Sequence, residues 1–162
     1  MSTDKSKKVS GKRKAGFNYV LERQIGFLLR LATQRHAMLF GQHISGRVTP
    51  QQLSTLVKLL EHGTCWQTQL GRMTAMDVAT MKGVVDRLVA REFVEVAADP
   101  ADGRRIQVTL TSAGKAIAER VRRDSIDIHN ATLAPLTAAE RERLITLLTK
   151  LVSSDSDAPL GK

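Results

Sequence analysis

Apolar residues recur at intervals of three and four over most of this chain, which is the spacing of an amphipathic helix. The first such pattern begins at Phe17, and we expect its helix to end between Gly41 and Gly46. One stripe runs along this helix and consists of Leu21, Ile25, Leu28, Leu29, Ala32, His36 and Leu39.

A second helix is predicted to begin at Thr49, which stands before a proline in the first helical position. Gln52 lies where a capping box requires a glutamine, and Gly63 is placed to cap the C-terminus. The apolar face of this helix consists of Leu53, Leu56, Val57 and Leu60.

Two shorter helices follow, separated by a turn over residues 73–76. The first spans about Trp66 to Gly71, with Trp66 and Leu70 facing inward. The second opens at Asp77, where a carboxylate suits the positive end of the helix dipole. We expect its buried stripe to consist of Val78, Met81, Val85 and Leu88.

The period changes to two between residues 94 and 110, where apolar and polar residues alternate on both sides of a Pro/Gly segment. Alternation of this kind is typical of half-buried strands. The pattern predicts a β-hairpin whose charged tip lies farthest from the core. Its apolar positions are Val94, Val96, Ile106, Val108 and Leu110.

The last part of the chain is again helical. Thr111 or Ser112 caps a long helix that Pro135 interrupts, and Thr137 with Glu140 forms a second capping box that opens the final helix. That helix carries more apolar residues than one stripe requires. The fold class predicted is mainly α with a small two-stranded β-wing, in the order of a winged helix-turn-helix with a helical dimerisation region.

Composition narrows the class of protein. A chain of 162 residues is about the size of one domain, and its single cysteine, Cys65, excludes an intramolecular disulfide and a cysteine-based zinc site. The start MSTDKSKK lacks the apolar core of a signal peptide, and no apolar run is long enough to span a membrane. We therefore expect a cytoplasmic protein with no membrane partner.

The chain is strongly basic, with a formal net charge of +9, and six of its basic residues lie in the first sixteen positions. This balance favours a polyanion such as nucleic acid as the partner. The alternative is a solvated surface with a flexible tail that has no role of its own.

The helix that opens at Asp77 has the place of a recognition helix, which enters the DNA major groove. Thr80 and Lys82 are able to contact a base or a phosphate, whereas Ala79 and Gly83 let the backbone approach closely. The alternative is an ordinary solvated helix face. The outward residues are Ala79, Thr80, Lys82, Gly83, Asp86 and Arg87.

Together, these segments resemble the MarR family of transcriptional regulators. The resemblance rests on DVATMKGVVDRL at residues 77–88, FVEV at 93–96, DPADGR at 99–104 and VTLTSAG at 108–114. The Asp-X-Arg of the wing, followed six residues after the arginine by Leu-Thr, is fairly specific to that family. The likeness covers about residues 17–152.

The resemblance implies that the wing tip reaches the DNA minor groove. Arg104 would be the residue that enters it, and Asp102 would hold the guanidinium by a charge-assisted hydrogen bond. Arg105 would contact a phosphate or pack against the hairpin. Many relatives carry a long basic or polar residue where this chain has Gly83, which leaves the target sequence open.

The family also implies a homodimer formed through the terminal helices, whose two-fold symmetry matches a palindromic operator. We accordingly divide the chain into a disordered basic tail (1–16), an N-terminal dimerisation helix (17–46), a DNA-binding lobe (47–111), C-terminal dimerisation helices (112–152) and a flexible tail (153–162).

Relatives bind small, often aromatic and anionic ligands, which implies an effector such as an aromatic carboxylate. His36 and Trp66 are the candidate ligand residues, although a protein partner for the histidine and a core position for the tryptophan are the alternatives. Cys65 is a further candidate as an oxidation sensor, but the family's peroxide sensors keep that cysteine in the first helix.

We find no motif for an enzyme, no cofactor-binding motif and no metal-ligand spacing, since the four histidines are scattered. The sequence therefore predicts a sequence-specific repressor that binds double-stranded operator DNA and is released by a small ligand. The alternative is an architectural protein that binds nucleic acid without regard to sequence.

Overall fold

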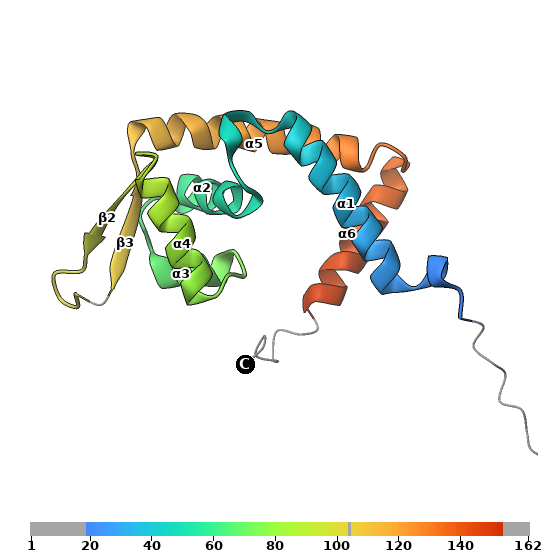
Figure 1. The fold of residues 1–162 in the computed structure, drawn as a ribbon, viewed down its shortest axis with the longest axis horizontal. Helices are drawn as coiled ribbons and strands as arrows, with labels where there is room; N and C mark the ends of the chain where they lie inside the picture. The colour runs from blue at the N-terminus through green and yellow to red at the C-terminus, as the bar shows by residue number, and fades with distance from the viewer. Residues whose placement is uncertain (1–18, 104, 154–162) are drawn as a thin grey trace, which may run out of the picture. The chain divides into compact units, whose positions relative to one another are not determined.

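The computed structural model describes residues 19–103 and 105–153 and shows a mainly helical chain with one small antiparallel sheet, two of whose strands project as a hairpin (Figure 1). The chain divides into two compact units, Met1–Gln34 and Arg35–Lys162. In the described residues, no helix is long and apolar enough to cross a membrane.

The described part of the first unit holds a short 3-10 helix, η1 (Leu21–Arg23), and the first turns of α1 (Ile25–His43). The α-helix therefore begins later than the periodicity predicts, because Gln24 is extended and separates the two elements. The predicted start at Phe17 lies outside the described residues. The end of α1 at His43 confirms the predicted end.

Helix α2 (Pro50–His62) follows η2 (Ser45–Arg47), and its predicted caps are confirmed. The Thr49 hydroxyl accepts from the Gln52 backbone N–H at 3.3 Å, and the Gln52 side chain accepts from the Thr49 N–H at 3.0 Å. Gly63, at a positive φ of 73°, donates its N–H to the carbonyl of Leu59 and closes the C-terminus.

Helices α3 (Gln67–Met73) and α4 (Val78–Val89) form the helix-turn-helix, with Ala75 at φ 52° in the turn. One predicted buried residue is wrong, since Val78 is 71% exposed while Val84 is fully buried. Val78 is the first residue of α4, and it precedes Met81, the first residue of the helix that is buried. The stripe that faces the core therefore consists of Met81, Val84, Val85 and Leu88.

The predicted hairpin is confirmed as β2 (Val94–Ala98) paired with β3 (Ile106–Leu110), Val96 lying opposite Val108. The sheet has a third strand, β1 (Cys65–Trp66), and its order is β1-β3-β2. Trp66 thus lies in a strand opposite Gln107, not in the predicted helix, because its backbone is extended at the position before α3.

The last two described helices are α5 (Ser112–Thr132), capped by the Thr111 hydroxyl, and α6 (Ala138–Ser153), opened by the predicted Thr137–Glu140 capping box. Helix α5 packs on α2 and η2. The core of the lobe gathers side chains from α2 to α5 and the sheet, among them Leu56, Leu59, Leu70, Met81, Leu88, Val108 and Val121.

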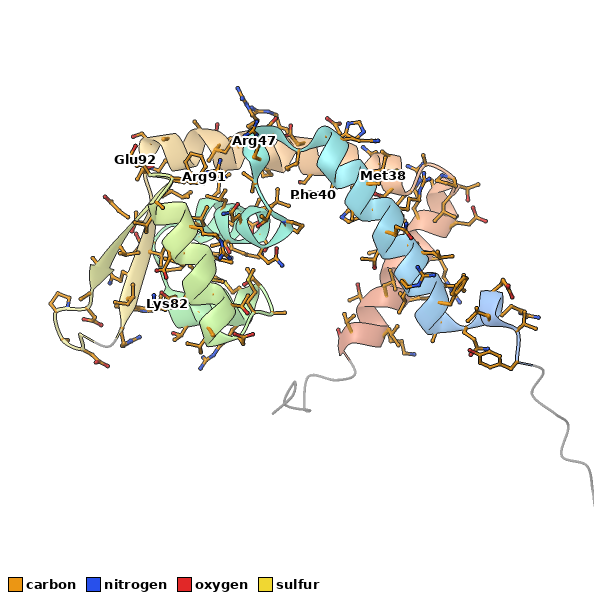
Figure 2. The ribbon with its side chains drawn as sticks, viewed as in Figure 1. Met38, Phe40, Arg47, Lys82, Arg91 and Glu92 are labelled. Atoms are coloured by element: carbon orange, nitrogen blue, oxygen red, sulfur yellow. The ribbon has the colours of Figure 1, made fainter. Side chains whose placement is uncertain are left out.

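Arg91, just after α4, connects that helix to the segment between α1 and α2. Its guanidinium donates to the backbone carbonyls of Gly46 and Arg47 and lies 4.5 Å from the centre of the Phe93 ring (Figure 2). The end of α4 is therefore tied to the short connection that leads into α2.

Candidate nucleic-acid interface

The start of α4 is organised by Asp77. Its carboxylate accepts the Thr80 backbone N–H at 2.7 Å and the Thr80 hydroxyl at 2.8 Å. These two hydrogen bonds lower the pKa of Asp77, the backbone bond contributing most. Because the Thr80 hydroxyl proton points at Asp77, the Thr80 oxygen is left to accept a hydrogen bond.

Lys82 extends from the exposed face of α4, one turn before Asp86. Its ammonium lies 2.7 Å from the Asp86 carboxylate, and both side chains are largely exposed. Exposed pairs of this kind are weak, so a DNA phosphate is able to compete for the lysine.

Gly83 leaves space that the side chain of Arg87 occupies. A Cβ at position 83 would lie 3.5 Å from one guanidinium nitrogen of Arg87 and 3.9 Å from its central carbon. The Arg87 side chain therefore folds back over Gly83, in the direction in which helical side chains lean. From the sequence we expected Gly83 to let the backbone approach closely, whereas in the structure the Arg87 guanidinium lies over it.

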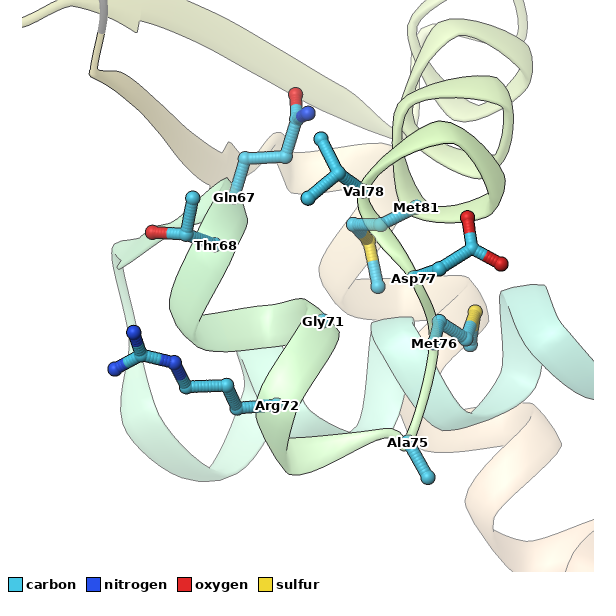
Figure 3. Close-up of a pocket in the computed structure, with 9 residues that line it drawn as sticks. All are labelled: Gln67, Thr68, Gly71, Arg72, Ala75, Met76, Asp77, Val78 and Met81. Carbon is cyan, nitrogen blue, oxygen red and sulfur yellow. The ribbon is translucent and has the colours of Figure 1, made fainter. Parts of the chain in front are cut away.

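Val78 is an exposed apolar residue at the N-terminus of α4, whereas the sequence pattern predicted it to be buried. An apolar side chain at this end of a recognition helix is able to contact a thymine methyl group. Val78 also lines a pocket between α3 and α4 (Figure 3). The other residues that line this pocket are Gln67, Thr68, Gly71, Arg72, Ala75, Met76, Asp77 and Met81.

Hydrogen bonds among the described residues close the wing tip. The Asp99 backbone N–H donates to Arg105 at 2.8 Å, the Arg105 N–H donates to the Asp102 carbonyl at 2.8 Å, and the Asp99 carboxylate accepts the Ala101 N–H at 2.9 Å. Arg104 lies outside the described residues, so its predicted contact with DNA and its pairing with Asp102 stay predictions.

Arg105 and Trp66 are brought together by the fold, although the sequence analysis placed them in different sites. The Arg105 guanidinium lies 4.2 Å from the centre of the Trp66 ring, and one of its nitrogens lies 3.9 Å from the Asp99 carboxylate. The Trp66 side chain is half-buried, so it does not belong to the buried core, and Arg105 lies over its ring.

His36 is exposed and hydrogen-bonded to α5, rather than buried in an apolar stripe. Its Nδ1 lies 3.0 Å from the Thr132 hydroxyl, which itself donates to the Ile128 carbonyl at 2.7 Å. Since a hydroxyl has one proton, His36 Nδ1 is the donor in this contact. The neutral histidine then keeps Nε2 as an acceptor.

Cys65 is buried in β1, and burial raises the pKa of its thiol. A raised pKa disfavours the thiolate that oxidants attack, which argues against a sensing role. Within residues 19–103 and 105–153, no three His, Cys, Asp or Glu side chains are grouped so that they could hold a metal ion.

A helix-turn-helix followed by a β-wing, with a capped and exposed second helix, defines a winged helix-turn-helix protein. The family model described as the MarR family matches residues 48–106. The repressor NicR of Pseudomonas putida is 38% identical over 141 residues, which cover 86% of this chain and 89% of the relative. The chain belongs to the MarR family.

Two solved structures have the same fold. A probable transcriptional regulator from Pseudomonas aeruginosa is 49% identical, with a TM-score of 0.77 over 82% of this chain and 99% of that one. BpsR of Bordetella bronchiseptica, whose DNA binding is regulated by 6-hydroxynicotinic acid, is 38% identical, with a TM-score of 0.78 over 83% and 96%.

Proposed function

We propose that this protein is a transcriptional repressor that binds a palindromic operator as a homodimer and releases it when a small aromatic carboxylate binds. The observation that carries the proposal is the exposed face of α4, capped by Asp77 and set beside a charged β-wing. An α-helix fits the major groove, where base edges are distinguishable.

In this proposal α4 lies in the major groove and the wing tip in the minor groove. We assign Arg87, whose side chain lies over Gly83, to a base edge, and Lys82, whose exposed ammonium pairs with Asp86, to a phosphate. Ala79 permits close approach of the backbone, Gly83 leaves room for the Arg87 side chain, and Thr80 supplies an acceptor. On the wing, Arg104 enters the minor groove with Asp102 as its partner.

The proposed dimer is formed by residues 17–46 and 112–152, with residues 47–111 as the DNA-binding lobe. The described helices of both segments carry exposed apolar side chains, such as Ile25 of α1 at 64% and Leu147 of α6 at 50%. Apolar surface of this extent favours a protein partner. A two-fold dimer presents two copies of α4 to the two halves of a palindrome.

The proposed effector is a hydroxylated pyridine carboxylate of the type that regulates BpsR. This proposal is supported by the 38% identity to BpsR over most of both chains. His36 is our candidate ligand residue because its Nε2 is able to accept a hydrogen bond, or to pair with a carboxylate when protonated. Trp66 is less suited, because Arg105 covers one of its faces.

The test is fluorescence anisotropy with DNA from upstream of the protein's own gene and with scrambled DNA, at about 150 mM salt. We expect a preference of about a thousandfold or more for the first DNA. Addition of 6-hydroxynicotinic acid should then release the protein. If the protein binds both DNAs equally and a selection from random sequences enriches no preferred sequence, the proposal is wrong. An architectural protein would then be favoured.

A further inference from the structure

The register of the sheet places three side chains in a row across one face. Trp66 of β1 and Ala97 of β2 both lie opposite Gln107 of β3. Arg105 precedes Gln107 by two residues and Asp99 follows Ala97 by two, and side chains two apart in a strand share a face. Trp66, Arg105 and Asp99 are thus diagonal or direct neighbours on the same side of the sheet.

The contacts agree with this register. The Arg105 guanidinium lies 4.2 Å from the Trp66 ring centre, which is the distance of a cation–π contact, and 3.9 Å from the Asp99 carboxylate. The Asp99 side chain is only 14% exposed, whereas that of Arg105 is 53% exposed. The guanidinium therefore bridges a ring at one end and a carboxylate at the other, with part of its surface in water.

Both partners of Arg105 are fixed to other parts of the lobe. Trp66 is the residue directly before α3, the first helix of the helix-turn-helix. Asp99 directly follows β2, and its backbone N–H donates to the Arg105 carbonyl. Its carboxylate also accepts the Ala101 backbone N–H, at the start of the tip. The contact consequently joins the tip of the wing to the helix that packs against α4.

We propose that Arg105 is a positioning residue that holds the wing tip at the angle required for DNA binding, through Trp66 and Asp99, rather than a phosphate ligand. The inference rests on the proposed function for its DNA readout. A phosphate would compete with the Asp99 carboxylate for the guanidinium of Arg105. Without the contact, the tip samples other orientations, and DNA binds only the competent fraction.

The first test needs no DNA. Trp66 is the single tryptophan of the chain, so tryptophan fluorescence reports on the surroundings of this ring. We expect R105Q to increase the quenching of Trp66 by acrylamide, because the guanidinium no longer covers the ring. R120Q, which removes the same charge from the exposed face of α5, is the matched control and should leave quenching unchanged. Equal quenching in R105Q and wild type would overturn the proposal.

The second test compares variants on operator DNA at several salt concentrations. W66L keeps the charge of Arg105, yet it should weaken binding as much as R105Q does, by about two- to fivefold for each wing. The double variant should bind no worse than either single variant. The dependence of log Kd on log salt should keep its wild-type slope in W66L and in R105Q alike.

A phosphate contact would give a different pattern. In that case W66L binds like wild type, while R105Q lowers the salt slope by about one for each subunit. Thermal unfolding checks that W66L folds. If W66L does not fold, R105K decides the question, since lysine keeps a phosphate contact but cannot stack as the planar guanidinium does.

The two proposals fail separately. If the wild-type protein shows no preference for any DNA, the proposed function is wrong, but the quenching of Trp66 still tests the role of Arg105. If the wild type prefers its operator and W66L binds equally well, the positioning role is wrong and the repressor function stands.

Discussion

At the residue scale, Asp77 determines how α4 begins. The Thr80 N–H and hydroxyl hold the pKa of Asp77 below its ordinary value, so the folded state favours the ionised carboxylate. Because the folded pKa is lowered, this stabilisation is present above the unfolded pKa and is lost as pH falls through the folded pKa.

We predict that D77N is less stable than wild type at neutral pH and that the difference shrinks in acid, below the ordinary range of an aspartate. Thermal unfolding at a series of pH values measures it. E140Q is a parallel test at the start of α6 and should show the same pH dependence, because the Thr137 N–H and hydroxyl also lower the pKa of Glu140. A difference that is constant with pH would contradict the assignment of the cap.

Arg104 is the second residue for which we make a prediction. Entry of a guanidinium into the narrow minor groove adds electrostatic attraction and shape recognition. We expect R104A to weaken operator binding about tenfold or more, equivalent to at least about 1.4 kcal/mol, without lowering the unfolding temperature. R120A controls for the loss of one charge. Unchanged affinity in an anisotropy titration would contradict the placement of Arg104 in the groove.

At the scale of elements, the junction between the wing and α5 depends on Gly114. A Cβ at this position would overlap the Phe93 carbonyl oxygen and would lie 2.8 Å from its carbon. Both atoms belong to the backbone, so the first turn of α5 would have to move away from the end of α4 and the start of β2. Close packing of these elements therefore requires a glycine.

We predict that G114A destabilises the protein by about 1–3 kcal/mol or more, as overpacking of a well-packed site does. The control is G41A in α1, where a Cβ would meet no atom within 4 Å. There, loss of the helical glycine should stabilise the protein by about 0.5–1 kcal/mol. Chemical denaturation of both variants measures the two effects, and a neutral G114A would contradict the described packing.

At the scale of the whole molecule, the exposed apolar side chains of α6 are the test of the dimer. We predict that light scattering gives about twice the 17.8 kDa mass of one chain. L147E should shift the protein toward the monomer and weaken operator binding, because a charge replaces an apolar contact. T149E, on the polar side of the same helix, is the control. A monomeric wild-type protein would refute the dimer.

The structure confirms local features that the sequence predicted in detail. The Thr49–Gln52 and Thr137–Glu140 capping boxes, the Asp77 cap and the hairpin were all visible, because their partners lie within a few residues or share one period. The motifs over residues 77–114 also identified the MarR family correctly. The DNA and ligand residues stay predictions.

The sequence by itself therefore determined the kinds of element, their order and the family, since caps and periodicities act between neighbours in the chain. Only the tertiary structure decided that Val78 is exposed and Val84 buried, that Trp66 joins the sheet as part of β1, and that Arg105 stacks on Trp66. These outcomes depend on strand register and on the packing of α3 against α4. Both bring together residues that are far apart in the chain, and no local pattern records which of them meet.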